Sequence, residues 1–226
     1  MNSTDVDPRR LVVRLAVAVM TADGRITAAE RDVVTALEGI GLGPLSDLID
    51  DEIQRAIRQP PDLVAACDQL ADISPEAALV IMAVLCEIAA SDRSVTAREL
   101  ATLSSIAAQL GLRADDLEHL LGSAMAAYDA PLVAEPVVPP SDVSGVSGTA
   151  DVARDPGLER ALCVLGLSSN ADRARVDAAY LDLVTRYNPT KVIDLGVEFV
   201  ALAIRKLAMI TEAFEYVRDA GSEERA

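Results

Sequence analysis

The sequence predicts an all-α protein that consists of a seven-helix bundle, a disordered linker and a small helical hairpin. Hydrophobic residues make up 51% of the 226 residues, yet aromatic residues supply only 3% and tryptophan is absent. Ala, Leu and Val dominate the apolar content, which suits closely packed helices better than a sheet. One segment, Pro131 to Gly157, is rich in Pro, Ser, Gly and Val and lacks helical periodicity. We therefore expect two helical domains, residues 1–130 and 157–226, joined by a flexible linker at 131–156.

The first domain is expected to contain seven short helices. Ser74 can cap the free backbone amides of a helix start, and Pro75 suits the first helical position. Apolar residues such as Leu79 and Met82 recur at helical spacing and would face a shared core. The predicted helices are Arg9–Ala22, Thr27–Ile40, Pro44–Arg58, Pro61–Ile73, Pro75–Ser91, Thr96–Leu110 and Ala114–Tyr128.

The net charge of −16 argues against broad contact with nucleic acid or an anionic membrane, because such contacts need clustered Lys and Arg. Residues 1–130 carry most of this charge, with 21 acidic and 10 basic side chains, whereas residues 157–226 carry 11 and 9. The first residues lack the order of a signal peptide. The most apolar stretch, Ala77–Ala90, is too short to cross a bilayer and contains Glu87. We expect a cytoplasmic protein that neither binds nucleic acid nor inserts into a membrane.

A motif in the first domain occurs twice. ADGRITAAE recurs as SDRSVTARE, which superposes Asp23 on Asp92 and Glu30 on Glu99. In both copies a Thr followed three residues later by Glu is typical of a capping box at a helix start. The same Asp and Glu also match the second half of an EF-hand loop, but the first half is missing, so neither loop can bind calcium alone. If the repeats meet around a pseudo-twofold axis, the four acids could instead offer a divalent cation an all-oxygen site.

This repeat is similar to the TerB-like domains associated with tellurite resistance, which carry the same pattern of Asp, an apolar residue and Glu. The resemblance covers about residues 10–128. It implies a helical domain that is linked to stress responses and to metal binding. The second copy departs from the first, because Arg93 and Ser94 stand where the first copy has Gly24 and Arg25.

Residues 157–226 predict a short helix followed by two antiparallel helices. Apolar residues recur at helical spacing in two segments, one from Val176 to Tyr187 and one from Val200 to Val217, and each set forms one apolar stripe. Between them, Pro189 stops the first long helix and Gly196 allows the chain to begin the second. A short helix and a long antiparallel pair can form a small core.

The segment VLGLSSNADRARVDAAYLDLVTRYNPTK, together with ITEAFEYV, resembles a J domain, the module by which DnaJ-type co-chaperones engage a DnaK-type chaperone. The resemblance covers nearly all of residues 157–220. Joined to a TerB-like domain, it resembles the DjlA family, whose members carry a membrane anchor; we expect no such anchor in this chain.

The resemblance implies that the hairpin loop is the surface that binds the partner. J domains carry His-Pro-Asp there, whereas this loop reads Asn-Pro-Thr, and Thr lacks the carboxylate that the family uses to engage an arginine of the chaperone. Acidic and apolar residues also replace the usual bases on the preceding helix, which would penalise docking on an acidic chaperone. The candidate partner-binding residues are Leu181, Arg186, Asn188, Pro189, Thr190 and Lys191.

We predict a non-enzymatic adaptor that binds proteins in proteostasis or a stress response and needs no cofactor. The sequence contains two interaction modules and no assembled nucleophile, phosphate-binding loop or acid and base pair. The altered loop predicts that the chain does not stimulate a DnaK-type ATPase. Two alternatives stay open. One is a working co-chaperone of a DnaK-type chaperone, and the other is a stress protein that binds a divalent cation through Asp23, Glu30, Asp92 and Glu99.

Overall fold

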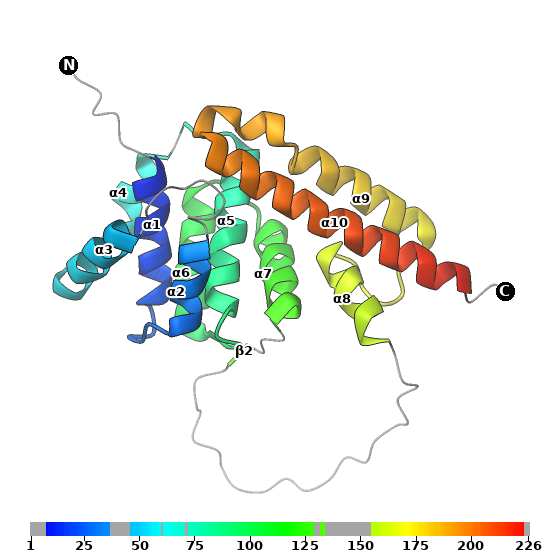
Figure 1. The fold of residues 1–226 in the computed structure, drawn as a ribbon, viewed down its shortest axis with the longest axis horizontal. Helices are drawn as coiled ribbons and strands as arrows, with labels where there is room; N and C mark the ends of the chain where they lie inside the picture. The colour runs from blue at the N-terminus through cyan, green and yellow to red at the C-terminus, as the bar shows by residue number, and fades with distance from the viewer. Residues whose placement is uncertain are drawn as a thin grey trace, which may run out of the picture.

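The computed structural model describes residues 8–36, 46–59, 61–70, 72–128, 132–133 and 155–223, and the all-α prediction is confirmed for them (Figure 1). Before the predicted linker, the described residues contain seven α-helices close to the predicted positions, although the fourth is shorter than predicted and ends at Asp68 rather than at Ile73. Residues 37–45, where the second helix was expected to end and the third to begin, lie outside the described residues. The seven helices are α1 Pro8–Met20, α2 Ala28–Ala36, α3 Ser46–Arg58, α4 Leu63–Asp68, α5 Pro75–Ala90, α6 Ala97–Gln109 and α7 Ala114–Tyr128.

Helix α5 lies at the centre of the first domain, where it contacts α1, α2, α6 and α7. All residues from Ala77 to Ala90 are buried, as expected for a helix that is apolar on every side. Ser74 begins the helix, because its side chain accepts a hydrogen bond of 3.1 Å from the backbone N of Ala77, and Pro75 takes the first helical position. None of the described helices combines the length and the apolar character needed to cross a bilayer.

Two short strands were not predicted. Strand β1, Val95–Thr96, pairs in parallel with β2, Leu132–Val133, and Val95 lies opposite Leu132. Strand β2 therefore lies inside the segment that was expected to be a disordered linker. Residues 134–154 of that segment lie outside the described residues.

The C-terminal unit, residues 155–223, contains a short helix and a helical hairpin. Helix α8, Pro156–Val164, precedes α9, Arg173–Arg186, and α10, Val197–Glu223. Figure 1 shows α9 and α10 side by side and antiparallel, as predicted. A 3₁₀ helix, η2, Pro189–Leu195, bridges them, and it was not predicted. Gly196 follows η2 with φ of +116°, a conformation that favours glycine, so the chain can turn into α10.

The C-terminal unit packs directly on the first domain, and the two share one continuous apolar core. Helix α8 contacts α7, while η2 and α10 contact α5. At this contact His119 Nε2 on α7 donates a hydrogen bond of 2.9 Å to the carbonyl oxygen of Val164. Gly166 adopts φ of +70°, and a Cβ atom there would lie 3.2 Å from His119 Nδ1. Glycine is therefore needed at this position both for the turn and for the close approach.

Candidate functional site

The two copies of the acidic motif fold in the same way, and both form capping boxes. Glu30 Oε2 accepts hydrogen bonds from Thr27 N at 2.6 Å and Thr27 Oγ1 at 2.9 Å, while Thr27 Oγ1 accepts one from Glu30 N at 3.2 Å. Thr96 and Glu99 repeat the arrangement at 2.7, 2.8 and 3.2 Å. The capping interpretation of these four residues is therefore correct.

The turns before these helices are also equivalent. Asp23 Oδ1 accepts a hydrogen bond from Arg25 N at 2.8 Å, and Asp92 Oδ1 accepts one from Ser94 N at 2.9 Å. Gly24 has φ of +84° in the first turn, and Arg93 has φ of +66° in the second. The second copy thus keeps the left-handed turn with Arg93, a residue whose Cβ atom makes this backbone conformation sterically strained.

The acids of the two copies influence one another electrostatically. Glu30 and Glu99 are 2% and 3% exposed. Burial raises the pKa of Glu30 to about 7, the Thr27 hydrogen bonds oppose this increase, and the charges of Glu99 and Asp92 add to it. Burial also raises the pKa of Glu99, and Asp23 and Asp92 contribute to the increase.

This arrangement does not favour the metal-binding alternative. Among the described residues, no group of three or more His, Cys, Asp or Glu side chains is placed to hold a metal ion. One carboxylate oxygen of Glu30 and one of Glu99 are already used by capping hydrogen bonds. The acidic motif is therefore explained by helix starts and tight turns.

The predicted partner-binding loop lies against the first domain. Lys191 Nζ lies 2.5 Å from Glu76 Oε1, and Ser74 Oγ donates a hydrogen bond of 3.3 Å to the carbonyl oxygen of Lys191. Arg186 forms an ion pair with Asp116 of α7. The structure thus brings Arg186 and Lys191 together at the contact between the first domain and the C-terminal unit.

The remaining loop residues are arranged differently. Asn188 Oδ1 accepts hydrogen bonds from Thr190 N at 3.0 Å and from Thr190 Oγ1 at 2.8 Å. These bonds cap η2, which Pro189 begins, so Asn188 and Thr190 have a local structural role. Leu181 is 64% exposed on α9.

Asp116 is the most strongly perturbed acid at this contact. Burial alone would raise its pKa, but hydrogen bonds from Arg113 and Arg186 outweigh that effect and lower the pKa to about 2. The Lys191 ammonium group similarly lowers the pKa of Glu76. Both acids are therefore held in their charged form by basic partners.

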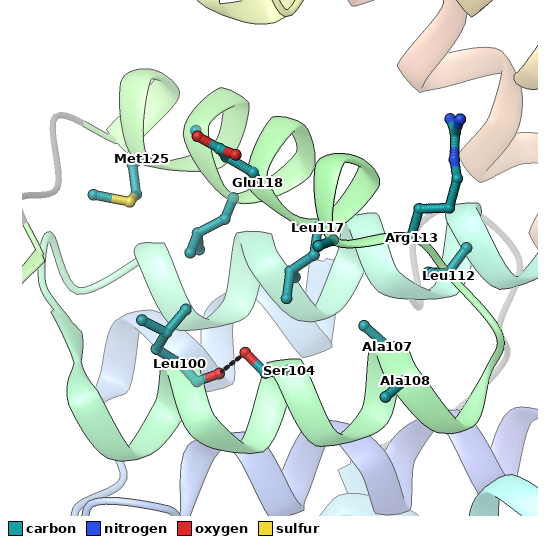
Figure 2. Close-up of a pocket in the computed structure, with 12 residues that line it drawn as sticks. Leu100, Ser104, Ala107, Ala108, Leu112, Arg113, Leu117, Glu118 and Met125 are labelled. Carbon is teal, nitrogen blue, oxygen red and sulfur yellow. Dashed lines mark hydrogen bonds between the residues drawn. The ribbon is translucent and has the colours of Figure 1, made fainter.

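An apolar groove of about 490 Å³ lies between α6 and α7. In Figure 2, Leu100 of α6 and Leu117 of α7 point into the space between the two helices, and Arg113 points away from it. Ser104 Oγ donates a hydrogen bond of 2.8 Å to the Leu100 carbonyl oxygen, so its polar group is turned toward its own helix. The groove is lined by Leu100, Ser104, Ala107, Ala108, Leu112, Arg113, Ala114, Leu117, Glu118, Leu121, Gly122 and Met125.

The groove was not predicted, although the sequence contains a feature that is consistent with it. Small residues, among them Ala107, Ala108, Ala114 and Gly122, line the groove. Small side chains leave space that larger ones would fill. Only the packing of α6 against α7 shows that these positions border one groove.

The family model described as "Tellurite resistance protein TerB" matches residues 4–121, which is slightly more than half of the chain. The match covers α1 to α6 and part of α7. No curated protein and no solved structure matches the chain.

Proposed function

The chain belongs to the TerB family, and on this premise we propose that it is a non-enzymatic adaptor that binds proteins in a cytoplasmic stress response. The apolar groove between α6 and α7 supports the proposal most directly. A concave, mainly apolar surface with a few polar side chains at its edge is the usual form of a binding site.

The chemistry of the groove favours an amphipathic peptide segment as its occupant. Leucine side chains and Met125 offer an apolar surface. The small, exposed side chains of Ala108 and Ser104 leave space for a ligand over the surface of α6. The surrounding domain is strongly acidic, with 21 acids against 10 bases over residues 1–130. A segment with apolar residues at helical spacing and flanking Lys or Arg would complement both features.

A displayed peptide library tests this proposal with the intact chain. We expect selection to enrich peptides that combine apolar residues at helical spacing with basic flanks. Ala108→Trp fills the groove and should abolish their binding, because the indole ring takes the space of the ligand. Ala174→Trp, at an exposed position of α9, is the matched control and should leave binding unchanged. Selected peptides that bind the Ala108→Trp variant as tightly as the wild type would contradict the proposal.

A co-chaperone function is the second candidate, because α9 and α10 form the expected antiparallel pair bridged at Pro189. We propose that this hairpin does not stimulate a DnaK-type ATPase. Thr190 supplies no carboxylate, and Asn188 and Thr190 bond to each other. A steady-state ATPase assay should show no stimulation by the wild-type chain. Clear stimulation that disappears in the Pro189→Ala variant would favour the co-chaperone instead.

A further inference from the structure

Three arginines from two helices converge on one buried carboxylate. Arg10 and Arg14 lie one turn apart on the same face of α1, and Arg55 lies one turn after Glu52 on α3. Helices α1 and α3 pack against each other (Figure 1). Their contact places the three guanidinium groups around the carboxylate of Glu52, whose side chain is 3% exposed. We call Arg10, Arg14 and Arg55 the arginine cluster.

The arginine cluster carries more positive charge than its acidic partner can neutralise. Arg10 Nε lies 3.3 Å from Glu52 Oε1, Arg14 Nε lies 3.5 Å from Oε2, and Arg55 donates a hydrogen bond to Oε1. Burial would raise the pKa of Glu52, but the arginines outweigh this effect and lower it, so the carboxylate is charged. Within the part of the chain that the structure describes, Glu52 is the only acid paired with these bases. Three positive charges therefore meet one negative charge.

Many hydrogen-bond donors of the cluster are also unused. Each guanidinium group has five N–H donors, whereas a carboxylate offers two oxygens. Arg14 Nε is buried and, among the described residues, has no hydrogen-bond partner. The side chains of Arg10 and Arg55 are 43% and 50% exposed, against 3% for Glu52. The buried carboxylate thus holds the arginines together, while two of them stay open to solvent and to a ligand.

Acids that are close in sequence do not remove this excess of charge. Asp50 and Asp51 precede Glu52 on α3, but Asp50 lies 3.2 Å from Arg31 of α2, and Asp51 is exposed and forms no ion pair with the cluster. The domain as a whole is acidic, with 21 acids against 10 bases over residues 1–130. A group of three bases on one acid is therefore an exception in this domain, and an ion pair that only joins α1 to α3 would need a single base.

A phosphate group matches the unused charge and donors. Arginine binds phosphate through paired hydrogen bonds from its planar guanidinium group. A phosphate monoester carries about 1.5–2 negative charges at neutral pH and presents three acceptor oxygens. A second carboxylate would bring one charge and two oxygens, and would leave part of the positive charge unneutralised.

We propose that the arginine cluster binds a phosphate group, either of free inorganic phosphate or of a phosphorylated Ser or Thr side chain. None of its three residues lines the groove between α6 and α7. The phosphate site is therefore separate from the groove, and the inference does not depend on the proposed function.

Isothermal titration calorimetry of the full chain tests the proposal with three probes. These are sodium phosphate, the peptide acetyl-Gly-Gly-Ser-Gly-Gly-amide phosphorylated on its serine, and the same peptide without phosphate. We expect saturable binding of at least one phosphate-bearing probe and no binding of the unphosphorylated peptide. Phosphopeptide binding that is tighter than phosphate binding by about tenfold or more identifies a phosphorylated side chain as the ligand. Equal or weaker phosphopeptide binding identifies free phosphate.

Substitutions connect the binding to the cluster. Arg55→Gln and Arg10→Gln should each weaken binding by about tenfold or more, because each removes charge-assisted hydrogen bonds to the ligand. Arg55→Lys keeps the charge but not the planar donors, so it should restore only part of the affinity. Arg175→Gln removes the same charge from an exposed position of α9 and should leave binding unchanged. Circular dichroism melting curves check that each variant is folded.

Two results would overturn the inference. One is the absence of saturable binding of either phosphate-bearing probe to the wild-type chain. The other is an affinity that is the same in the wild type and in folded Arg55→Gln and Arg10→Gln variants. Groove-selected peptides should bind the Arg55→Gln variant as tightly as the wild type, so a failure of the groove proposal is recognised separately.

Discussion

Glu30 shows how one side chain both supports a helix start and carries an electrostatic cost. Its carboxylate accepts two hydrogen bonds from Thr27, yet it is 2% exposed and its pKa is raised to about 7. In the unfolded chain the carboxyl group titrates near 4.5. Because the folded state holds its proton more tightly, the stability linked to Glu30 is present at low pH and is lost as the pH rises through 7.

Glu30→Gln should therefore stabilise the protein more at alkaline pH than at acidic pH. Glutamine can keep the capping hydrogen bond from the backbone but bears no charge. The gain in the free energy of unfolding should reach the order of 1–3 kcal/mol above neutral pH and should shrink toward pH 4.5. Urea unfolding across this range measures it, with exposed Glu212→Gln as the control. A gain that is the same at every pH would contradict the electrostatic account.

At the scale of elements, helix starts were predictable because their causes are local in sequence. Ser74 with Pro75, and Thr96 with Glu99, each place a helix start by contacts within four residues. The pairing of β1 with β2 could not be predicted, because each strand has two residues and the partners lie far apart in the chain. The groove between α6 and α7 escaped prediction for a similar reason, since it depends on how two helices pack.

Thr96→Ala should destabilise α6 by about 1–2 kcal/mol, because it removes the hydroxyl that accepts the Glu99 amide hydrogen and donates to the buried Glu99 carboxylate. Chemical denaturation followed by circular dichroism measures the loss. The exposed Ser105→Ala in the middle of the same helix should change stability by no more than about 0.5 kcal/mol. Equal effects of the two substitutions would show that the capping box is not needed.

At the scale of the whole molecule, the sequence predicted two helical parts but not their contact. The charge difference between residues 1–130 and 157–226 was visible, yet charge alone does not place Lys191 beside Glu76 or Arg186 beside Asp116. The assignment of Arg186 and Lys191 to an interaction surface stays a prediction for an external partner. Within the chain, these residues bind the first domain.

We propose that this TerB family protein acts by binding an amphipathic protein segment in the groove between α6 and α7. The dissociation constant of a library-selected peptide, measured by fluorescence anisotropy for the wild type, Ala108→Trp and Ala174→Trp, tests it most directly. The account predicts that Ala108→Trp weakens binding by tenfold or more, which corresponds to about 1.4 kcal/mol, and that Ala174→Trp has no effect. Equal dissociation constants for all three proteins would contradict it.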